Sequence, residues 1–138
     1  GYCSDCTRTF LFGDDGRHEA FKQHYALVLK AHELVKEKLV SGMTGREADE
    51  IARGCFRAEG LDGFFTHSLG HGIGLQIHEY PVLAPRGEET LSDGMVFSDE
   101  PGLYFEGKYG IRIEDSVYLK EGRVVSFMKK TSRELIIL

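Results

Sequence analysis

The sequence predicts an α+β fold in which helices cover one face of an antiparallel sheet. Two helical patterns fall in the first half of the 138 residues, and strand and turn patterns fill the second half. Such segregation of helices and strands along a chain is typical of this fold class. The length suits one domain with one core, and no linker, repeat or low-complexity segment divides residues 1–138.

The chain begins with a predicted strand and a predicted long helix. Residues 2–12, "YCSDCTRTFLF", are rich in aromatic and β-branched residues, and "GDDGR" at 13–17 predicts a turn. From residue 19 to residue 40, apolar positions recur at helical spacing and define one buried face. These positions are Phe21, Tyr25, Val28, His32, Val35 and Leu39.

A second helix is predicted between Thr44 and Gly60. "TGRE" has the form of a capping box, with Thr44 as the N-cap and Glu47 as the third helical residue. The apolar face that follows consists of Ala48, Ile51, Ala52, Cys55 and Phe56.

The remaining sequence, from Phe64 onward, predicts an antiparallel meander of strands. "MVFSDEPGLYF" is a strand interrupted by Pro101-Gly102, and "YGIRIEDSVYLK" alternates apolar and polar residues. "EGR" then forms a hairpin turn into "VVSF", and a short terminal strand closes the chain.

Composition and charge exclude several classes of function. Hydrophobic residues make up 41% of the chain, charged residues make up 28%, and the net charge is −5. A net negative charge argues against nucleic acid as a partner, and no apolar run approaches the roughly 20 residues that span a membrane. The cysteines are Cys3, Cys6 and Cys55. "YCSDC" lacks the second pair of a zinc site and the helix of a redox motif, so reduced thiols and a cytoplasmic location are expected.

One glycine-rich segment, "HSLGHGIGLQIHEYP", carries His67, His71 and His78. A single histidine in such a segment would more often be a hydrogen-bonded core residue than a ligand. The glycines beside His71 remove neighbouring Cβ atoms, so a ligand or another backbone can approach closely. Three imidazoles together favour one wall of a metal site, because imidazole is a common metal ligand.

Carboxylates occur at three further strand or strand-end positions. Glu114 shares a strand face with Arg112, Glu100 precedes a turn, and Asp5 lies in the first predicted strand. Each position alone would also fit a solvated strand or loop. Combined with His71, they form an oxygen and nitrogen ligand set suited to Mn, Co, Fe or Zn, and such ions can deprotonate water for hydrolysis.

The segments "SDCTRTF", "HSLGHGIGLQIHEYP", "GMVFSDEPGLYF" and "GIRIEDSVYL" resemble, in order, the signatures of the pita-bread metallopeptidases of family M24. That family includes methionine aminopeptidase, Xaa-Pro dipeptidase, Xaa-Pro aminopeptidase and creatinase. "SDCTRT" and "GHGIGLQIHE" are more similar to the Xaa-Pro branch. The resemblance implies a pita-bread (creatinase/aminopeptidase) fold, with a curved antiparallel sheet and helices on its convex face. Residues 1–138 would be the C-terminal portion of the catalytic domain, with the N-terminal half missing.

The resemblance also implies a set of metal ligands. Asp5, His71, Glu100 and Glu114 match ligands of two divalent ions, Asp5 and Glu114 being the bridging residues. Glu100 would also be the general base for the water between the ions. The ions would be Mn or Co, with Zn or Fe as alternatives.

Other matched residues face the substrate rather than the ions. His67 and His78 match histidines that contact the peptide or stabilise the tetrahedral intermediate, and Arg112 matches an arginine beside the site. The family's first metal aspartate lies upstream of Asp5 and has no counterpart after Gly1. We therefore expect this chain to be a fragment with weak or no peptidase activity, and the full-length protein to form a homodimer.

Four functions remain open at this point. The resemblance favours hydrolysis of Xaa-Pro bonds at peptide N-termini or in dipeptides. A methionine aminopeptidase, a metal-free pita-bread binding module and a creatinase-like enzyme are the alternatives. The expected partner is a peptide substrate, without nucleic acid or membrane.

Overall fold

A computed structural model of the chain describes residues 1–13, 16 and 18–138. The helices are α1 (Glu19–Lys38), α2 (Gly45–Arg57) and the 3₁₀ helix η1 (Asp62–Phe64). The strands are β1 (Phe10–Leu11), β2 (Gly70–Gly72), β3 (Glu79–Leu83), β4 (Val96–Asp99), β5 (Gly102–Phe105), β6 (Tyr109–Arg112), β7 (Asp115–Lys120), β8 (Arg123–Ser126) and β9 (Ile136–Ile137). The turn predicted at 13–17 falls largely on Asp14, Asp15 and Arg17, which lie outside the described residues.

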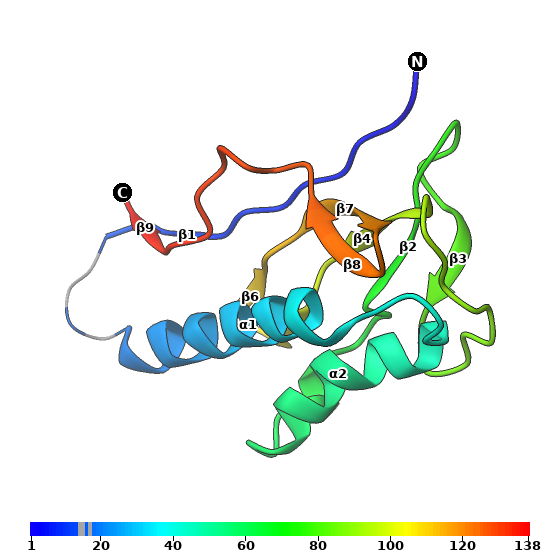
Figure 1. Cartoon of the computed structure of the whole chain (residues 1–138). Coiled ribbons are helices and arrows are strands. Elements are labelled where there is room, and N and C mark those ends of the chain that lie inside the picture. Colours follow the sequence, from blue (N-terminus) through cyan, green and yellow to red (C-terminus); the bar gives the residue numbers. More distant parts are fainter. Residues whose placement is uncertain (14–15, 17) are drawn as a thin grey trace.

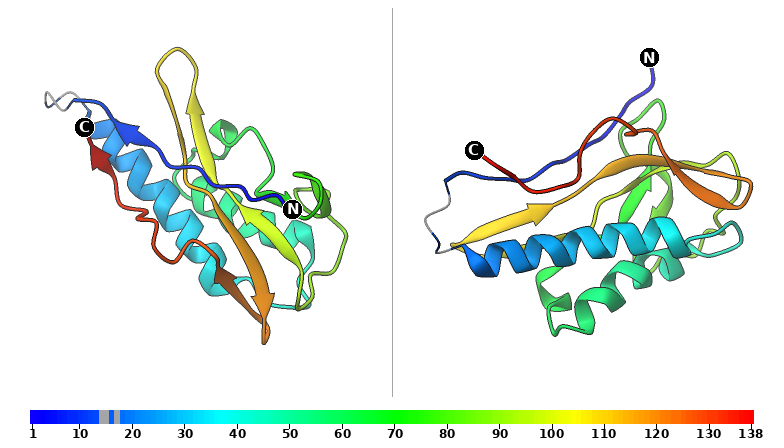
Figure 2. Two further views of the ribbon diagram at one scale, coloured as in Figure 1. Left: turned by 90° about the horizontal axis from the view of Figure 1, so that it is seen from above. Right: turned by 60° about the vertical axis from the view of Figure 1, so that its left-hand side comes forward.

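The elements form layers, as the α+β prediction requires. Helices α1 and α2 lie on one side of the strands, and the N-terminal and C-terminal segments run across the other side (Figures 1 and 2). Strand β1 pairs in parallel with β9, so the two terminal segments lie side by side. Within the described residues, no helix is long and apolar enough to cross a membrane.

The larger sheet has the strand order β3-β2-β4-β7-β8, and each of these pairs is antiparallel. This order differs from the predicted meander, because β4 pairs with β2 rather than with the preceding strand β3. The start of α2 packs against β3, because a Cβ atom at Gly45 would lie 2.0 Å from the carbonyl oxygen of Val82, and β4 pairs on the other side of β2. Strands β5 and β6 form a separate hairpin, after which β7 returns to the sheet beside β4.

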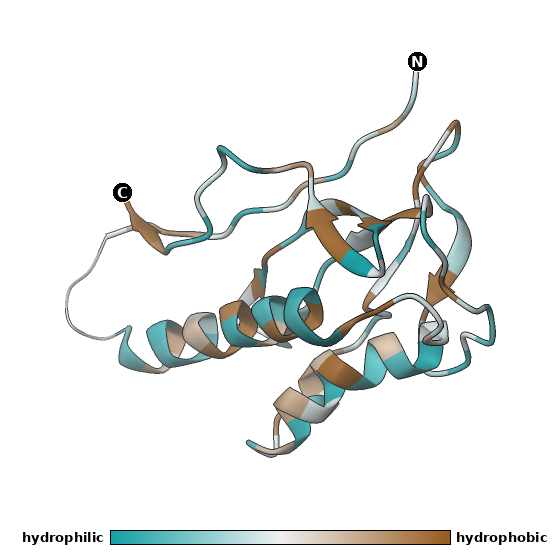
Figure 3. Ribbon diagram, viewed as in Figure 1, coloured by the Kyte–Doolittle hydropathy of each residue, from teal (hydrophilic) through white to brown (hydrophobic). Residues whose placement is uncertain are grey.

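Both helices present an apolar face to the sheet, as their sequence patterns predict. Figure 3 shows hydrophilic and hydrophobic residues in alternating bands along each helix. The predicted face of α1 is buried, and Ala48, Ala52 and Phe56 of α2 join it in one core with Phe97 of β4. The capping box of α2 forms as predicted, with Thr44 and Glu47 each bonding to the other's backbone N–H.

The strand predicted over residues 2–12 is much shorter than expected. Only Phe10–Leu11 pairs as a strand among the described residues there, together with an isolated bridge between Thr7 and Glu114. The preceding backbone is held largely by other contacts, since the N–H of Asp5 donates to Ser116 Oγ at 3.0 Å. Aromatic and β-branched composition therefore predicted an extended segment correctly but a regular strand incorrectly.

A buried charge cluster connects α1 to the sheet. It consists of His32 of α1, Asp99 of β4 and Asp115 of β7, and all three side chains are inaccessible to solvent. His32 Nδ1 lies 3.0 Å from Asp99 Oδ2, and His32 Nε2 lies 3.5 Å from Asp115 Oδ2. Burial opposes protonation of His32, but the two aspartates outweigh it and raise the pKa of His32 from 6.5 to about 9.

This raised pKa predicts a specific loss of stability with pH. Protonated His32 stabilises the fold fully below pH 6.5, its value in an unfolded chain, and this contribution is lost as the pH rises through about 9. Urea unfolding between pH 6 and 10 measures the decline, and His32→Gln should remove this part of it. His24→Gln is the control, because burial lowers the pKa of His24 whereas that of His32 is raised. The same decline in His32→Gln as in the unmodified chain would contradict the assignment.

Candidate metal centre

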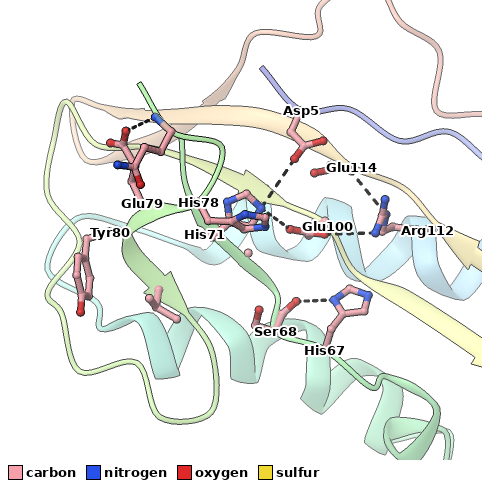
Figure 4. Close-up of a pocket in the computed structure, with 13 residues that line it drawn as sticks. Asp5, His67, Ser68, His71, His78, Glu79, Tyr80, Glu100, Arg112 and Glu114 are labelled. Carbon is pink, nitrogen blue, oxygen red and sulfur yellow. Dashed lines mark hydrogen bonds and ion pairs between the residues drawn. The ribbon is translucent and has the colours of Figure 1, made fainter. Parts of the chain in front are cut away.

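A cavity of about 1090 Å³ is lined by residues of the N-terminal segment and of strands β2, β3 and β6. Its lining contains every site residue singled out from the sequence (Figure 4). These residues are Asp5, His67, His71, His78, Glu100, Arg112 and Glu114. They come from four separate segments of the sequence, so only the tertiary structure brings them together.

Close packing of strands explains the glycines around His71. A Cβ atom at Gly70 would lie 1.9 Å from the carbonyl oxygen of Ser98, and one at Gly72 would lie 2.0 Å from that of Tyr80. The sequence left open whether a ligand or another backbone approaches these glycines. In the structure, the backbones of the neighbouring strands occupy the space. The result is that β2 sits tightly between β3 and β4 with His71 directed into the cavity.

The His71 ring is oriented with one nitrogen toward the carboxylates. Its Nδ1–H donates to the carbonyl oxygen of Gly72 at 3.1 Å, which directs Nε2 into the cavity. Nε2 lies 3.2 Å from Glu100 Oε1 and 3.9 Å from Asp5 Oδ2. A backbone hydrogen bond to the second ring nitrogen is the arrangement that metal-binding histidines commonly have.

Asp5, His71 and Glu114 form a group that could hold a metal ion. One ligand atom of each lies within 4.8 Å of the others, and Glu100 approaches the same histidine from the end of β4. Figure 4 shows Asp5 extending from the N-terminal segment toward His71, with Glu100 and Glu114 beside them. A mixed set of carboxylate oxygens and one imidazole nitrogen can bind a divalent transition metal.

The electrostatics of the cavity favour a bound cation. Burial raises the pKa of Glu114 to about 7, and the nearby charges of Glu100 and Asp5 add to this shift. Burial also opposes ionisation of Glu100, but hydrogen bonds with His71 and Ser98 lower the pKa of Glu100 below its usual value. Burial and, to a smaller extent, the neighbouring carboxylates make Glu114 hard to ionise, and a divalent ion would offset both effects. The residues present therefore fit a metal centre.

Three hydroxyl residues that the sequence did not single out hold the candidate ligands in place. Ser98 Oγ donates to Glu100 Oε1 at 2.9 Å and accepts the backbone N–H of His71 at 3.0 Å. Thr7 Oγ1 donates to Glu114, and Ser116 Oγ donates to the backbone oxygen of Asp5 at 2.7 Å. Ser98 precedes Glu100 by two residues on a strand, so side-chain alternation was a signal that could have identified it.

The other two histidines lie on different sides of the centre. His67 Nδ1–H donates to the carbonyl oxygen of Ser68, and its Nε2 lies 2.8 Å from the hydroxyl of Tyr104. Tyr104 is a further residue that the sequence reasoning missed. His78 is exposed, and its ring centroid lies 4.2 Å from that of His71.

Arg112 provides positive charge beside the carboxylates. Its guanidinium lies 3.8 Å from Glu100 and 3.7 Å from Glu114, and its Nε donates to Thr7 Oγ1 at 2.9 Å. Ile111 and Ile113, the residues on either side, are fully buried. The predicted division of this segment into an apolar face and a cavity face is therefore confirmed.

Residues 1–121 match the model of metallopeptidase family M24, and the chain belongs to this family. Its relatives include the Xaa-Pro dipeptidase of Pyrococcus furiosus, which is 42% identical over 135 residues, or 98% of this chain. That match covers 38% of the relative, so the chain spans well under half of the relative's length.

Solved structures agree with this assignment. The Xaa-Pro dipeptidase from Bacillus anthracis superposes with a TM-score of 0.93 at 42% identity, over 99% of this chain and 38% of that one. An X-Pro aminopeptidase from Thermotoga maritima gives 0.91 at 39% identity, again over 99% and 38%. The predicted pita-bread fold and the resemblance to family M24 are thus confirmed. The N-terminal domain of the FACT subunit SPT16 from chickpea shares the fold at 23% identity, with a TM-score of 0.85.

The position of Ser98 predicts that Ser98→Ala weakens metal binding. Ser98 orients both His71 and Glu100, and loss of such supporting hydrogen bonds typically costs 10–100-fold in metal affinity. We expect about a tenfold increase in the Kd for Mn²⁺, measured by titration calorimetry. Ser92→Ala, at an exposed serine outside the cavity, should leave the Kd unchanged. An unchanged Kd in Ser98→Ala would contradict the supporting role.

Metal binding should also depend on pH in a defined direction. Glu114, with a pKa of about 7, must lose its proton to bind an ion, so Mn²⁺ affinity should fall as the pH drops from 8 to 6. Titrations in buffers of different ionisation enthalpy should show a proton released on binding near pH 6.5. Affinity that stays constant over this range would exclude Glu114 as a titrating ligand.

Proposed function

We propose that this chain supplies four ligands of a two-metal centre in a peptidase that hydrolyses Xaa-Pro bonds in dipeptides or at peptide N-termini. The convergence of Asp5, His71, Glu100 and Glu114 carries the proposal. Relatives named as Xaa-Pro dipeptidases support the choice of substrate. Because the chain spans 38% of their length, the activity is proposed for the whole protein, in which residues 1–138 are the C-terminal portion of the catalytic domain.

In this proposal the four ligands have different roles. His71 and Glu100 would hold one ion, and Asp5 and Glu114 would contribute ligand oxygens to both ions. The oxygen-rich set with one imidazole suits Mn²⁺ or Co²⁺, with Zn²⁺ or Fe²⁺ as alternatives. When bound, the ions supply Lewis-acid polarisation of the scissile carbonyl and activation of water.

The residues around the ions prepare the peptide and move protons. Glu100 acts as general base, and the hydrogen bond that Ser98 Oγ donates to its Oε1 orients it. His78, exposed at the cavity, donates to the substrate. His67 stabilises charge that develops on the carbonyl oxygen, with Tyr104 fixing its ring. The positive charge of Arg112 offsets the electrostatic repulsion between the carboxylates of Glu100 and Glu114.

A chimera tests the activity in a complete enzyme. This chain replaces the matching 135-residue segment of the Pyrococcus furiosus Xaa-Pro dipeptidase. We expect Mn²⁺- or Co²⁺-dependent hydrolysis of Met-Pro but not of Met-Ala. Glu100→Gln should lower kcat at least 100-fold, because general-base catalysis contributes about 10²–10⁴. Glu106→Gln, at an exposed glutamate in the β5–β6 turn, is the matched control.

The other outcomes of this assay identify the competing functions. Preferential cleavage of Met-Ala would indicate a methionine aminopeptidase. A folded chimera that binds no metal and cleaves neither dipeptide would indicate a binding module or creatinase-like chemistry. The 138-residue chain alone is expected to show weak or no turnover.

A further inference from the structure

We propose that His32, Asp99 and Asp115, the buried charge cluster, position the glutamate ligands of the metal centre from the opposite side of the sheet. The inference rests on the proposed metal centre and adds a function for residues that line no part of its cavity. Its evidence is the strand register, the contacts of His32 and the connections of Asp115.

The strand register places the cluster directly behind the ligands. Asp99 and Asp115 are paired residues of β4 and β7, and Glu100 and Glu114 are their immediate neighbours in sequence. Because successive side chains of a strand point to opposite faces, the aspartates point toward α1 while the glutamates point into the cavity. The distance between the two strand ends therefore sets the distance between the two glutamates.

His32 is the group that spans those strand ends. It approaches Asp99 with one ring nitrogen, at 3.0 Å, and Asp115 with the other, at 3.5 Å. A rigid ring fixes the separation of its two partners, because its nitrogens cannot move independently. The three side chains are fully buried, so solvent cannot substitute for any of these contacts.

Asp115 extends the cluster to the segment that carries Asp5. Arg8 binds Asp115 Oδ1 at 2.7 Å and also donates to the backbone oxygens of Thr7 and Glu114, at 2.7 and 2.6 Å. Arg133 donates to Asp115 from the C-terminal segment, through Nε at 2.9 Å. One aspartate, the immediate neighbour of Glu114 in sequence, thus connects α1, β7 and both terminal segments.

Burying charged side chains costs free energy, so the cluster is better explained by positioning the two glutamates than by holding α1 on the sheet. Apolar residues of similar size commonly hold a helix on a sheet as well as a buried ion pair does, or better. The fully buried Val28 and Val35 of α1 already do so on either side of His32. What the charged cluster adds is a pair of charged contacts, from one ring to two strands, at the point where both strands lead to a proposed ligand.

The test compares His32→Gln and Asp99→Asn with Val28→Ala in the 138-residue chain. Val28→Ala is the matched control, since Val28 is equally buried on the same face of α1, one turn away. Circular dichroism and urea unfolding establish that each variant is folded. Mn²⁺ affinity is then measured by calorimetry, and the visible spectrum of the Co²⁺-loaded protein reports ligand geometry. Amide chemical shifts of Glu100 and Glu114 are recorded without metal.

Positioning predicts a result that simple destabilisation does not. Folded His32→Gln or Asp99→Asn should bind Mn²⁺ at least tenfold more weakly, with an altered Co²⁺ spectrum and shifted amides at Glu100 and Glu114. Val28→Ala should change stability but none of these three readouts. Equal effects in all variants, or no effect in a folded cluster variant, would overturn the proposal.

The same experiment separates this proposal from the proposed function. If the unmodified chain binds no Mn²⁺, the proposed metal centre fails. The amide shifts in the metal-free protein still decide whether the cluster positions the two glutamates.

Discussion

The antiparallel register between β4 and β7 is the constraint on which the rest of this structure depends. Asp99 pairs with Asp115, so the adjacent residues Glu100 and Glu114 emerge together on the opposite face. A slip of one residue would exchange the two faces, burying the glutamates against α1 and exposing the aspartates in the cavity. Both the buried charge cluster and the candidate metal centre are consequences of this one alignment.

The two faces of that strand pair deal with negative charge in different ways. On the helix side, the aspartates are neutralised by protein cations, namely His32, Arg8 and Arg133. On the cavity side, Arg112 is the nearby cation for Glu100 and Glu114, and Glu114 retains a pKa near 7. Charge that the protein leaves uncompensated in a cavity favours a bound cation. The charges on the helix side therefore stabilise the fold, whereas those on the cavity side are available to bind a cation.

The glycine-rich segment contributes in a way that composition alone could not specify. Its glycines admit the backbones of β3 and β4 on either side of His71. Close packing on both sides leaves the imidazole a defined direction, with Nδ1 bonded to backbone and Nε2 directed to Asp5 and Glu100. Rigidity of this kind is what a metal ligand requires, since binding then costs little reorganisation.

The amino-acid sequence by itself determined the helices, the capping box and the cavity residues. The helices follow from periodicity, and the capping box from two residues three positions apart, which are local properties. Ordered segments around Asp5, His71, Glu100 and Glu114 identified the family. Roles for these residues remain proposals, while their convergence in one cavity is observed.

Only the tertiary structure decided the strand order, the limited pairing of residues 2–12 and the supporting residues. The pairing of β4 with β2 joins strands that are not consecutive, and the contacts of Ser98, Tyr104 and Arg8 join segments distant in sequence. The pattern placed His32 on a buried face but gave no sign of its two aspartate partners. The physical reason is the same in each case: such contacts depend on distances through space, which spacing along the chain does not encode.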